Sequence, residues 1–267
     1  ATALPAQAAR VADPLAYGSA PATVAPAAPV AGQHGMAVSA QKLASEVGAR
    51  ILAKGGNAAD AAVAMGYALA VVYPAAGNLG GGGFMMLRPP GQPSIFFDFR
   101  EKAPLATTAD MYLDINGNVI PDLSVLGWTA VAFPGTVAGL DAVHARWGHL
   151  PRQVIMEPAI KLARDGFVLG EGDVQLLNTS TAALAKDPYA RKVFLRPDGS
   201  PFQPGDRLVQ KDLAHSLELI AQNGADAFYK GPIAASILEQ SKAHGGILQA
   251  KDFEHYQPRE LPPISCT

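Results

Sequence analysis

Two short apolar runs, Phe84 to Arg88 and Ser94 to Phe99, constrain the fold more than any other feature of this sequence. The five residues between them, "PPGQP", are proline, glycine and glutamine, which favour a turn. The pattern predicts two antiparallel strands joined by that turn. The blocks on both sides of the strands have helical spacing, so helices should cover at least one face of the sheet. The sequence therefore predicts an α+β fold.

The first helical block is "QKLASEVGARILAKGG", in which apolar residues recur at every third or fourth position and two glycines end the helix. Asn57 is placed to cap a second helix, "AADAAVAMGYALAVVY", with Asp60 in its first turn. We also expect a short strand from Gly35 to Ala40, before the first helix. Alanine and glycine on several sides of the second helix imply that it packs closely against another layer.

Helices dominate the sequence after Gly135 and form a helical extension of the fold. Each block is followed by or ends in glycine, which is a common helix stop. Two shorter stretches, "DINGNV" and "RPDGSPF", carry the Asn-Gly and Asp-Gly signals of hairpin turns. The helical blocks are "GTVAGLDAVHARW", "RQVIMEPAIKLARDG", "DLAHSLELIAQNG" and "PIAASILEQSKAHGG".

The composition excludes several classes of protein. Of the 267 residues, 49% are hydrophobic and 16% are charged, with a net charge of -2, which argues against a disordered chain and against electrostatic binding of nucleic acid. The longest apolar stretches are interrupted by glycine and proline, so we expect no membrane span. One cysteine, Cys266, excludes an internal disulfide.

We expect no metal and no cofactor. The six histidines form none of the spacings typical of metal ligands. The four glycines from Gly80 to Gly83 lack the lysine and the helix start that a phosphate-binding loop requires. They favour a tight turn whose backbone packs closely against another segment.

The chain divides by composition into two regions. Residues 1–31 contain 13 alanines and 5 prolines without a period that would bury one face, so they are predicted to form an extended N-terminal arm. Residues 32–267 are predicted to form the folded region.

Arg100 directly follows the second apolar strand, in "FFDFREK". A guanidinium group stays charged and needs a partner. One hypothesis is a structural salt bridge with Asp98, Glu101 or Asp114. The other is an anion site, because packing would hold the base of the side chain and its planar fork can bind a carboxylate through two parallel hydrogen bonds. The local pattern leaves both hypotheses open.

Several blocks in order resemble the large subunit of gamma-glutamyltransferases, also called gamma-glutamyltranspeptidases, from about Gly35 to Tyr256. The resemblance implies an N-terminal nucleophile hydrolase, whose precursor cuts itself into two chains that share a four-layer αββα sandwich. This chain would supply part of that sandwich. The blocks are "GMAVSAQKLASEVGARILAKGGNAADAAVA", "NLGGGGFMMLR", "FFDFREKAP", "FPGTVAGL" and "EPAIKLARDGF".

The resemblance also implies a chemistry. Arg100 matches the arginine that grips the alpha-carboxylate of a gamma-glutamyl donor such as glutathione, while Asp98 and Glu101 would orient it or neutralise its surroundings. A threonine at the start of the small subunit of the same precursor would attack the gamma-carbonyl. Water, an amino acid or a dipeptide would then accept the acyl group. Family members in bacteria are mostly exported, so a periplasmic or secreted location is expected.

The match departs from the family at the C-terminal end. The sequence ends in "RELPPISCT", before the expected end of a large subunit, so we expect residues 32–267 to be incomplete there. Thr267 is the last residue and cannot start a following chain, so we expect no catalytic residue in this chain and no activity of the chain alone. Two alternatives stay open: a cephalosporin or glutaryl amidase on the same scaffold, and an inactive carboxylate-binding fragment.

Overall fold

The structure is a computed structural model that describes residues 31–266. The chain divides into two units, residues 1–34 and 35–267. The predicted N-terminal arm, residues 1–31, lies outside the described residues except at its last position, so the predicted boundary between 31 and 32 stays a prediction. All helices and strands of the described residues lie in the second unit.

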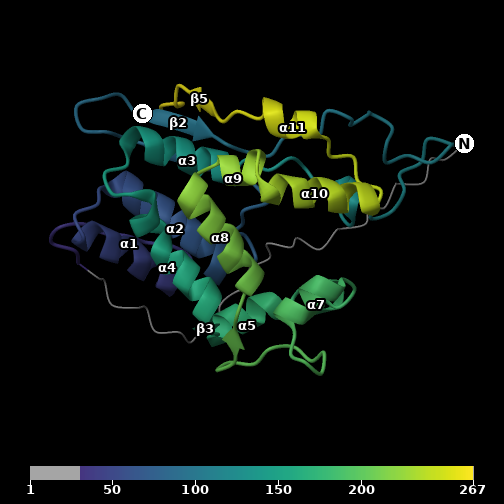
Figure 1. The fold of residues 1–267 in the computed structure, drawn as a ribbon, viewed down its shortest axis with the longest axis horizontal. Coiled ribbons are helices and arrows are strands. Elements are labelled where there is room, and N and C mark those ends of the chain that lie inside the picture. The colour runs from purple at the N-terminus through teal and green to yellow at the C-terminus, as the bar shows by residue number, and fades with distance from the viewer. Residues whose placement is uncertain (1–30, 267) are drawn as a thin grey trace, which may run out of the picture. The chain divides into compact units, whose positions relative to one another are not determined.

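Helices make up most of the second unit (Figure 1). All four helical blocks expected after Gly135 are confirmed, as are the two helices before the strands. The helices are α1 (Lys42–Ala53), α2 (Ala58–Val72), the 3-10 turn η1 (Trp128–Ala130), α3 (Thr136–Trp147), α4 (Arg152–Asp165), α5 (Glu171–Asn178), α6 (Thr181–Leu184), α7 (Pro188–Phe194), α8 (Lys211–Asn223), α9 (Asp226–Tyr229), α10 (Pro232–Ala243) and α11 (Ala250–His255).

The start of α2 is fixed by the two residues that the sequence singled out. The side chain of Asn57 accepts the N–H of Asp60 at 3.0 Å, and the carboxylate of Asp60 accepts the N–H of Asn57 at 2.9 Å. Asp60 is fully buried. Its carboxylate also accepts the N–H groups of His149 and Leu150, which lie just before α4. The predicted cap is therefore confirmed, and it ties two helices together.

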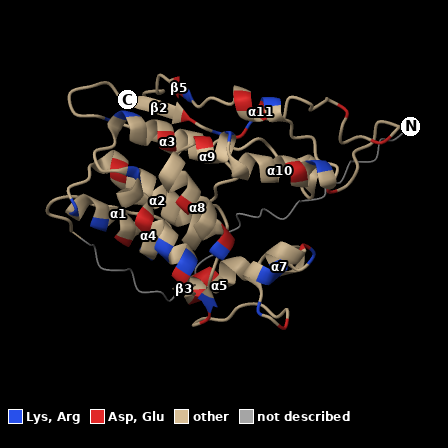
Figure 2. Ribbon diagram, viewed as in Figure 1, with Lys and Arg blue, Asp and Glu red and all other residues tan. Residues whose placement is uncertain are grey.

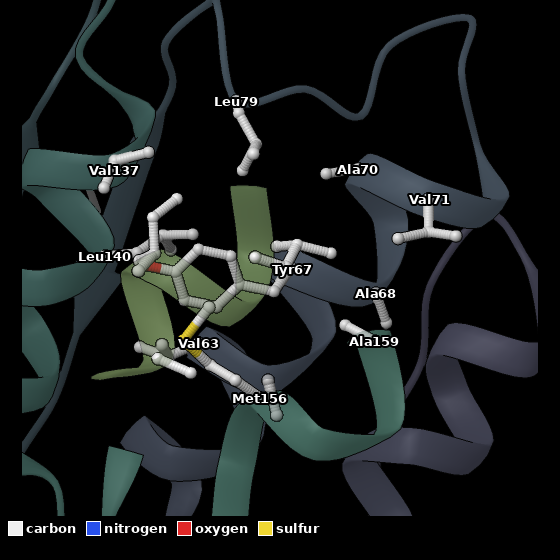
Figure 3. Close-up of a cluster of buried hydrophobic side chains, with 14 of the residues drawn as sticks. Val63, Tyr67, Ala68, Ala70, Val71, Leu79, Val137, Leu140, Met156 and Ala159 are labelled. Carbon is white, nitrogen blue, oxygen red and sulfur yellow. The ribbon is translucent and has the colours of Figure 1, made fainter. Parts of the chain in front are cut away.

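The core lies between α2 and the helices that pack on it. Figure 3 shows Tyr67 of α2 pointing toward Leu140 of α3, with Met156 of α4 beside its ring. Tyr67 is 1% exposed and Met156 is fully buried. Figure 2 draws α2 almost wholly in tan, since Asp60 is its one charged residue, whereas α4 carries charges along its length. Hydrophobic burial of α2 on several sides therefore organises the helical layer.

The predicted strand pair is confirmed and gains a third strand. β1 (Phe84–Leu87) pairs antiparallel with β2 (Ile95–Asp98), and β2 also pairs antiparallel with β5 (Arg259–Leu261). Figure 1 shows β5 (yellow) beside β2 (blue), although they lie far apart in sequence. A second sheet joins β3 (Phe167–Val168) to β4 (Arg207–Leu208). The sequence predicted neither β5 nor this second sheet.

The two faces of the three-stranded sheet differ. Phe97 points toward the helices, where its ring meets Trp147 of α3 edge-on at 5.3 Å. The register places Met86, Phe96 and Leu261 together on the opposite face. There Phe84 and Met86 are each 55% exposed and Leu261 is 37% exposed. Helices therefore cover one face of this sheet. Its other face is largely apolar and open in this chain, and it also carries the ion pair of Asp98 with Arg259.

The predicted strand from Gly35 to Ala40 is wrong. Residues 35–39 have no regular structure, and Met36 and Val38 are exposed while Ala37 packs near Gly48 of α1. The side chains alternate as in a strand, but no backbone partner lies beside the segment among the described residues. A strand needs a hydrogen-bonded neighbour as well as an alternating pattern.

The turn signals are confirmed as turns that do not lead into strands. "DINGNV" ends at Val119, whose pairing with Leu113 closes the turn, and "RPDGSPF" includes the turn closed by the pairing of Leu195 with Pro201. The observed helices and antiparallel strands confirm the α+β class. Within the described part of the chain, each helix is too short or too polar to cross a membrane.

Candidate anion-binding site at the end of strand β2

Arg100 follows the end of β2 by two residues and is largely exposed. Its side chain is 72% exposed, and its one ion pair among the described residues joins its Nε to Oε2 of Glu101 at 4.0 Å. That distance is at the outer limit for an ion pair, and exposed pairs of this kind contribute little to stability. The guanidinium group of Arg100 is therefore accessible to an anion.

Two of the salt bridges expected for Arg100 do not form. The carboxylate of Asp98 binds the guanidinium group of Arg259 on β5. Asp114 lies in the loop after the sheet, where it accepts the backbone N–H groups of Asn116 and Asn118. Of the three acids proposed as salt-bridge partners of Arg100, Glu101 alone contacts its guanidinium group, at 4.0 Å. Neither of the other two acids fixes the side chain of Arg100.

Asp98 acts on the backbone of Arg100 instead. Its Oδ1 accepts the N–H of Arg100 at 3.0 Å, the pattern of an Asx turn, and this turns the chain out of β2. Asp98 is 7% exposed. The hydrogen bond from the Arg100 N–H holds the pKa of the Asp98 carboxyl below its usual value, and the hydrogen bond and charge of Arg259 add to this, while burial opposes it. Asp98 is therefore ionised at neutral pH.

The glycine run packs tightly against the same strand end, which confirms its predicted role. Gly83 and Phe99 exchange backbone hydrogen bonds that extend the pairing of β1 with β2. A Cβ atom on Gly82 would lie 2.8 Å from the Cα of Arg100 and 2.7 Å from the backbone N of Glu101. Real side chains do not fit at such distances, so only glycine lets the loop approach Arg100 this closely.

The start of α3 completes this packing. The N–H groups of Gly135 and Thr136 both donate to the carbonyl of Gly81, at 2.7 and 3.0 Å. Asn78 binds the same loop, since its Oδ1 accepts the N–H of Gly81 at 2.8 Å and the hydroxyl of Thr136 at 2.6 Å. The free N–H groups of the helix start are thus used to hold the glycine loop beside Arg100.

Tyr256, which the sequence did not predict as part of the site, binds the backbone carbonyl of Arg100. Its hydroxyl donates to the carbonyl oxygen of Arg100 at 2.9 Å, across 156 residues of sequence. Burial raises the pKa of Tyr256 to about 12, and the negative charges of Asp98 and Glu101 add to the shift. No local pattern in the sequence marks Tyr256, because its contact with Arg100 joins segments far apart in the chain. Arg259 was not predicted either, for the same reason.

Other hollows and clusters lie elsewhere. A cavity of about 410 Å³ lies between α1 and α4, and is lined by residues that include Arg50 and Lys161. A more open one of about 460 Å³ lies next to Arg196 and Asp206. Arg100 lines neither of them. Among residues 31–266, no group of three or more His, Cys, Asp or Glu side chains is placed to hold a metal ion.

The family is identified by comparison. Residues 44–267 match the family model described as gamma-glutamyltranspeptidase. The chain is 53% identical over 239 residues to a glutathione hydrolase proenzyme of Pseudomonas sp. (strain A14), which covers 90% of this chain. The crystal structure of Helicobacter pylori gamma-glutamyltranspeptidase covers 88% of this chain and 68% of that one, with a TM-score of 0.86 and 42% identity. This likeness confirms the predicted fold, α+β of the N-terminal nucleophile hydrolase type.

Two further findings set limits on this likeness. The chain spans 42% of the length of the Pseudomonas glutathione hydrolase proenzyme, so it corresponds to less than half of such a protein. It is also 38% identical over 242 residues to an acylase, the ACY 1 proenzyme of Pseudomonas sp. (strain V22), which covers 88% of this chain and is itself covered over 43% of its length. The similarity of this chain thus extends to a protein named as an acylase as well as to glutathione hydrolases.

Proposed function

Because the chain belongs to the gamma-glutamyltranspeptidase family, we propose that it is the donor-binding part of an enzyme that transfers and hydrolyses gamma-glutamyl groups. The observation that carries the proposal is Arg100, an accessible guanidinium on a backbone held by neighbouring segments. It would bind the alpha-carboxylate of donors such as glutathione. A fixed planar fork meets a carboxylate through two parallel hydrogen bonds and loses little entropy in doing so.

The bond-breaking step would belong to a second chain. A threonine at the N-terminus of the small subunit of the same precursor would attack the gamma-carbonyl with its hydroxyl, while its own alpha-amine takes the proton. The amide C–N bond of the donor then breaks, and the departing amine receives that proton. The resulting gamma-glutamyl ester is cleaved by water or by the amine of an amino acid or dipeptide. Arg100 would hold the far end of the donor, so that its carbonyl meets the nucleophile in a reactive geometry.

The open face of the sheet supports a second chain. Phe84, Met86 and Leu261 expose apolar surface next to the strand end that carries Arg100. Contiguous apolar surface of this kind marks an interaction site. A small subunit that packs on this face would cover it.

The test is substitution of Arg100 in the complete two-chain protein. Arg100→Ala removes both hydrogen bonds, and Arg100→Lys keeps the charge but loses the fork. For gamma-glutamyl anilide we expect kcat/KM to fall on the order of 30-fold to 1000-fold with Arg100→Ala, and less with Arg100→Lys. Self-cleavage of the precursor should persist in both variants.

Arg88 offers a matched control for this test. It is an exposed arginine that directly follows β1, at the opposite end of the strand pair from Arg100. Arg88→Ala should leave kcat/KM within about twofold of the wild-type value, since surface charges remote from a site act weakly. Unchanged donor kinetics in both Arg100 variants would refute the assignment.

A cephalosporin or glutaryl amidase is the second candidate, and the similarity to the ACY 1 proenzyme favours keeping it. A glutaryl group also ends in a carboxylate that Arg100 could bind. Rates with gamma-glutamyl anilide and with glutaryl amides separate the two functions. Faster hydrolysis of the glutaryl amides would favour the amidase.

An inactive carboxylate-binding fragment is the third candidate. Mass spectrometry of purified material distinguishes it, because the enzyme requires a second chain that begins with threonine and co-purifies with this one.

We also propose that the protein is exported to the periplasm or beyond, as family members in bacteria mostly are. Activity measured in separated periplasmic and cytoplasmic fractions tests this location.

A further inference from the structure

Both backbone polar atoms of Arg100 are bound by side chains. The N–H of Arg100 donates to Asp98 at 3.0 Å, and its carbonyl accepts the hydroxyl of Tyr256 at 2.9 Å. On either side of it, Phe99 pairs with Gly83 and Lys102 pairs with Phe133, so the chain changes backbone partner at this point. Asp98 and Tyr256 therefore bind the backbone of Arg100 between these two places of backbone pairing.

The hydroxyl of Tyr256 is itself held in place. Its ring stacks on Tyr229 with the planes 4° apart and lies 5.5 Å from the ring of Phe133. The ammonium group of Lys102 lies 5.0 Å from the Tyr256 ring centre. A Cβ atom on Gly135 would lie 1.8 Å from the Tyr256 hydroxyl oxygen, so a glycine there is required for this hydroxyl to reach Arg100.

Asp98 is held by the same C-terminal segment. Arg259 lies opposite Asp98 in the register of β2 with β5 and binds its carboxylate. The backbone carbonyl of Gln257 accepts the ammonium group of Lys102 at 3.3 Å. Residues 256–261, which we call the C-terminal clasp, thus bind β2 and the residues after it through side chains, backbone and strand pairing.

We propose that Asp98 and Tyr256 are positioning residues for Arg100, through which the C-terminal clasp sets the direction of the guanidinium group toward the donor carboxylate. The proposal rests on the proposed role of Arg100 as the carboxylate-binding residue. A side chain on a fixed backbone needs less ordering when the ligand binds, so a looser backbone weakens the bidentate contact although Arg100 is still present.

The experiment compares two donors in the complete two-chain protein. Gamma-aminobutyryl anilide is gamma-glutamyl anilide without the alpha-carboxylate. The ratio of kcat/KM for the two donors, which we call the carboxylate preference, therefore reports what the carboxylate contact contributes. A general structural defect lowers both rates and leaves the ratio unchanged, whereas a loss of positioning lowers the ratio.

The expected results form an order. Arg100→Ala should remove most of the carboxylate preference. Tyr256→Phe, which deletes one oxygen atom, should lower it about fivefold to tenfold, mainly through KM for gamma-glutamyl anilide. Asp98→Ala should lower it about tenfold, and Asp98→Asn about threefold, since asparagine can still accept the N–H of Arg100.

Two control variants match these changes elsewhere in the chain. The hydroxyl of Tyr112 also donates to a backbone carbonyl, that of Thr129, at 2.9 Å. Asp206 also joins a backbone N–H, that of Gln203, to the guanidinium group of Arg196, with both distances 2.7 Å. Tyr112→Phe and Asp206→Asn should change the carboxylate preference by less than about twofold, because they make the same chemical changes as Tyr256→Phe and Asp98→Asn but away from Arg100.

Each outcome decides between the two proposals. An unchanged carboxylate preference in Arg100→Ala overturns the function proposed for Arg100, and the positioning role with it. A preference lost in Arg100→Ala but kept in Tyr256→Phe and Asp98→Ala overturns the positioning role alone. Equal losses with both donors assign a general structural role to Asp98 and Tyr256. If Asp98→Ala fails to fold, Tyr256→Phe decides by itself.

Discussion

The helical layer and the three-stranded sheet of this chain are completed to different degrees. Around α2 the chain buries its own apolar residues, and Tyr67 and Met156 are exposed by 1% or less. On the outer face of the sheet, Phe84 and Met86 remain 55% exposed. The helical layer thus has a core of its own, whereas the sheet has apolar surface for a further chain to cover.

Two buried carboxylates show the same contrast. Asp60 accepts backbone N–H groups at the start of α2 and before α4, and so joins helices to one another. Asp98 lies at the C-terminal end of the central strand β2, where it binds the backbone of Arg100 and the guanidinium group of Arg259. One carboxylate stabilises the core, and the other supports an exposed cation. Substitutions in each region can test this division of roles.

The largest effect is expected from a change in the helical core. Met156→Ala should lower the free energy of unfolding by about 2 to 5 kcal/mol, because it removes buried contacts and leaves a cavity. Met86→Ala is the matched change on the open face, and it should cost less than about 0.5 kcal/mol in this chain. Urea denaturation followed by circular dichroism measures both values. Equal losses for the two methionines would contradict the difference between the regions.

A smaller effect is expected where the sheet meets α3. Gly135→Ala places a methyl group 2.2 Å from the carbonyl oxygen of Phe99 and against Tyr256, so the backbone or the tyrosine must shift. We expect a loss of about 1 to 3 kcal/mol, typical of overpacking. Gly172→Ala in α5, where a Cβ meets nothing within 4 Å, is the control and should be neutral or stabilising. A neutral Gly135→Ala would show that this contact is not tight.

The smallest effect is expected from the pH dependence of Asp98. Its folded-state pKa is below the ordinary value of 3.8, chiefly because of the Arg100 N–H. Its stabilising contribution is therefore fully present above that ordinary value and is lost as the pH falls through the lowered folded-state pKa. The stability difference between wild type and Asp98→Asn should stay constant from pH 7 to about pH 5 and shrink below pH 4. Urea denaturation across this range measures it, and a difference that grows toward low pH would contradict the assignment.

Local patterns were sufficient to predict much of the fold. The apolar runs at 84–88 and 94–99 became β1 and β2, and the glycine-terminated blocks became helices. The cap by Asn57 and the position of Asp60 in the first turn of α2 were also predicted. These features depend on residues a few positions apart, so spacing and turn chemistry determine them. The expected strand at 35–40 failed because its alternating side chains say nothing about a backbone partner.

The candidate site was predicted in part. The sequence alone determined that a permanent cation follows an apolar strand at Arg100, and that glycines precede that strand pair. Only the tertiary structure decided that Asp98 pairs with Arg259, that Arg100 stays accessible, and that Tyr256 reaches the Arg100 carbonyl from 156 residues away. Side-chain type and spacing are local properties of the chain, whereas the choice of partner depends on which distant segments the packed core brings together.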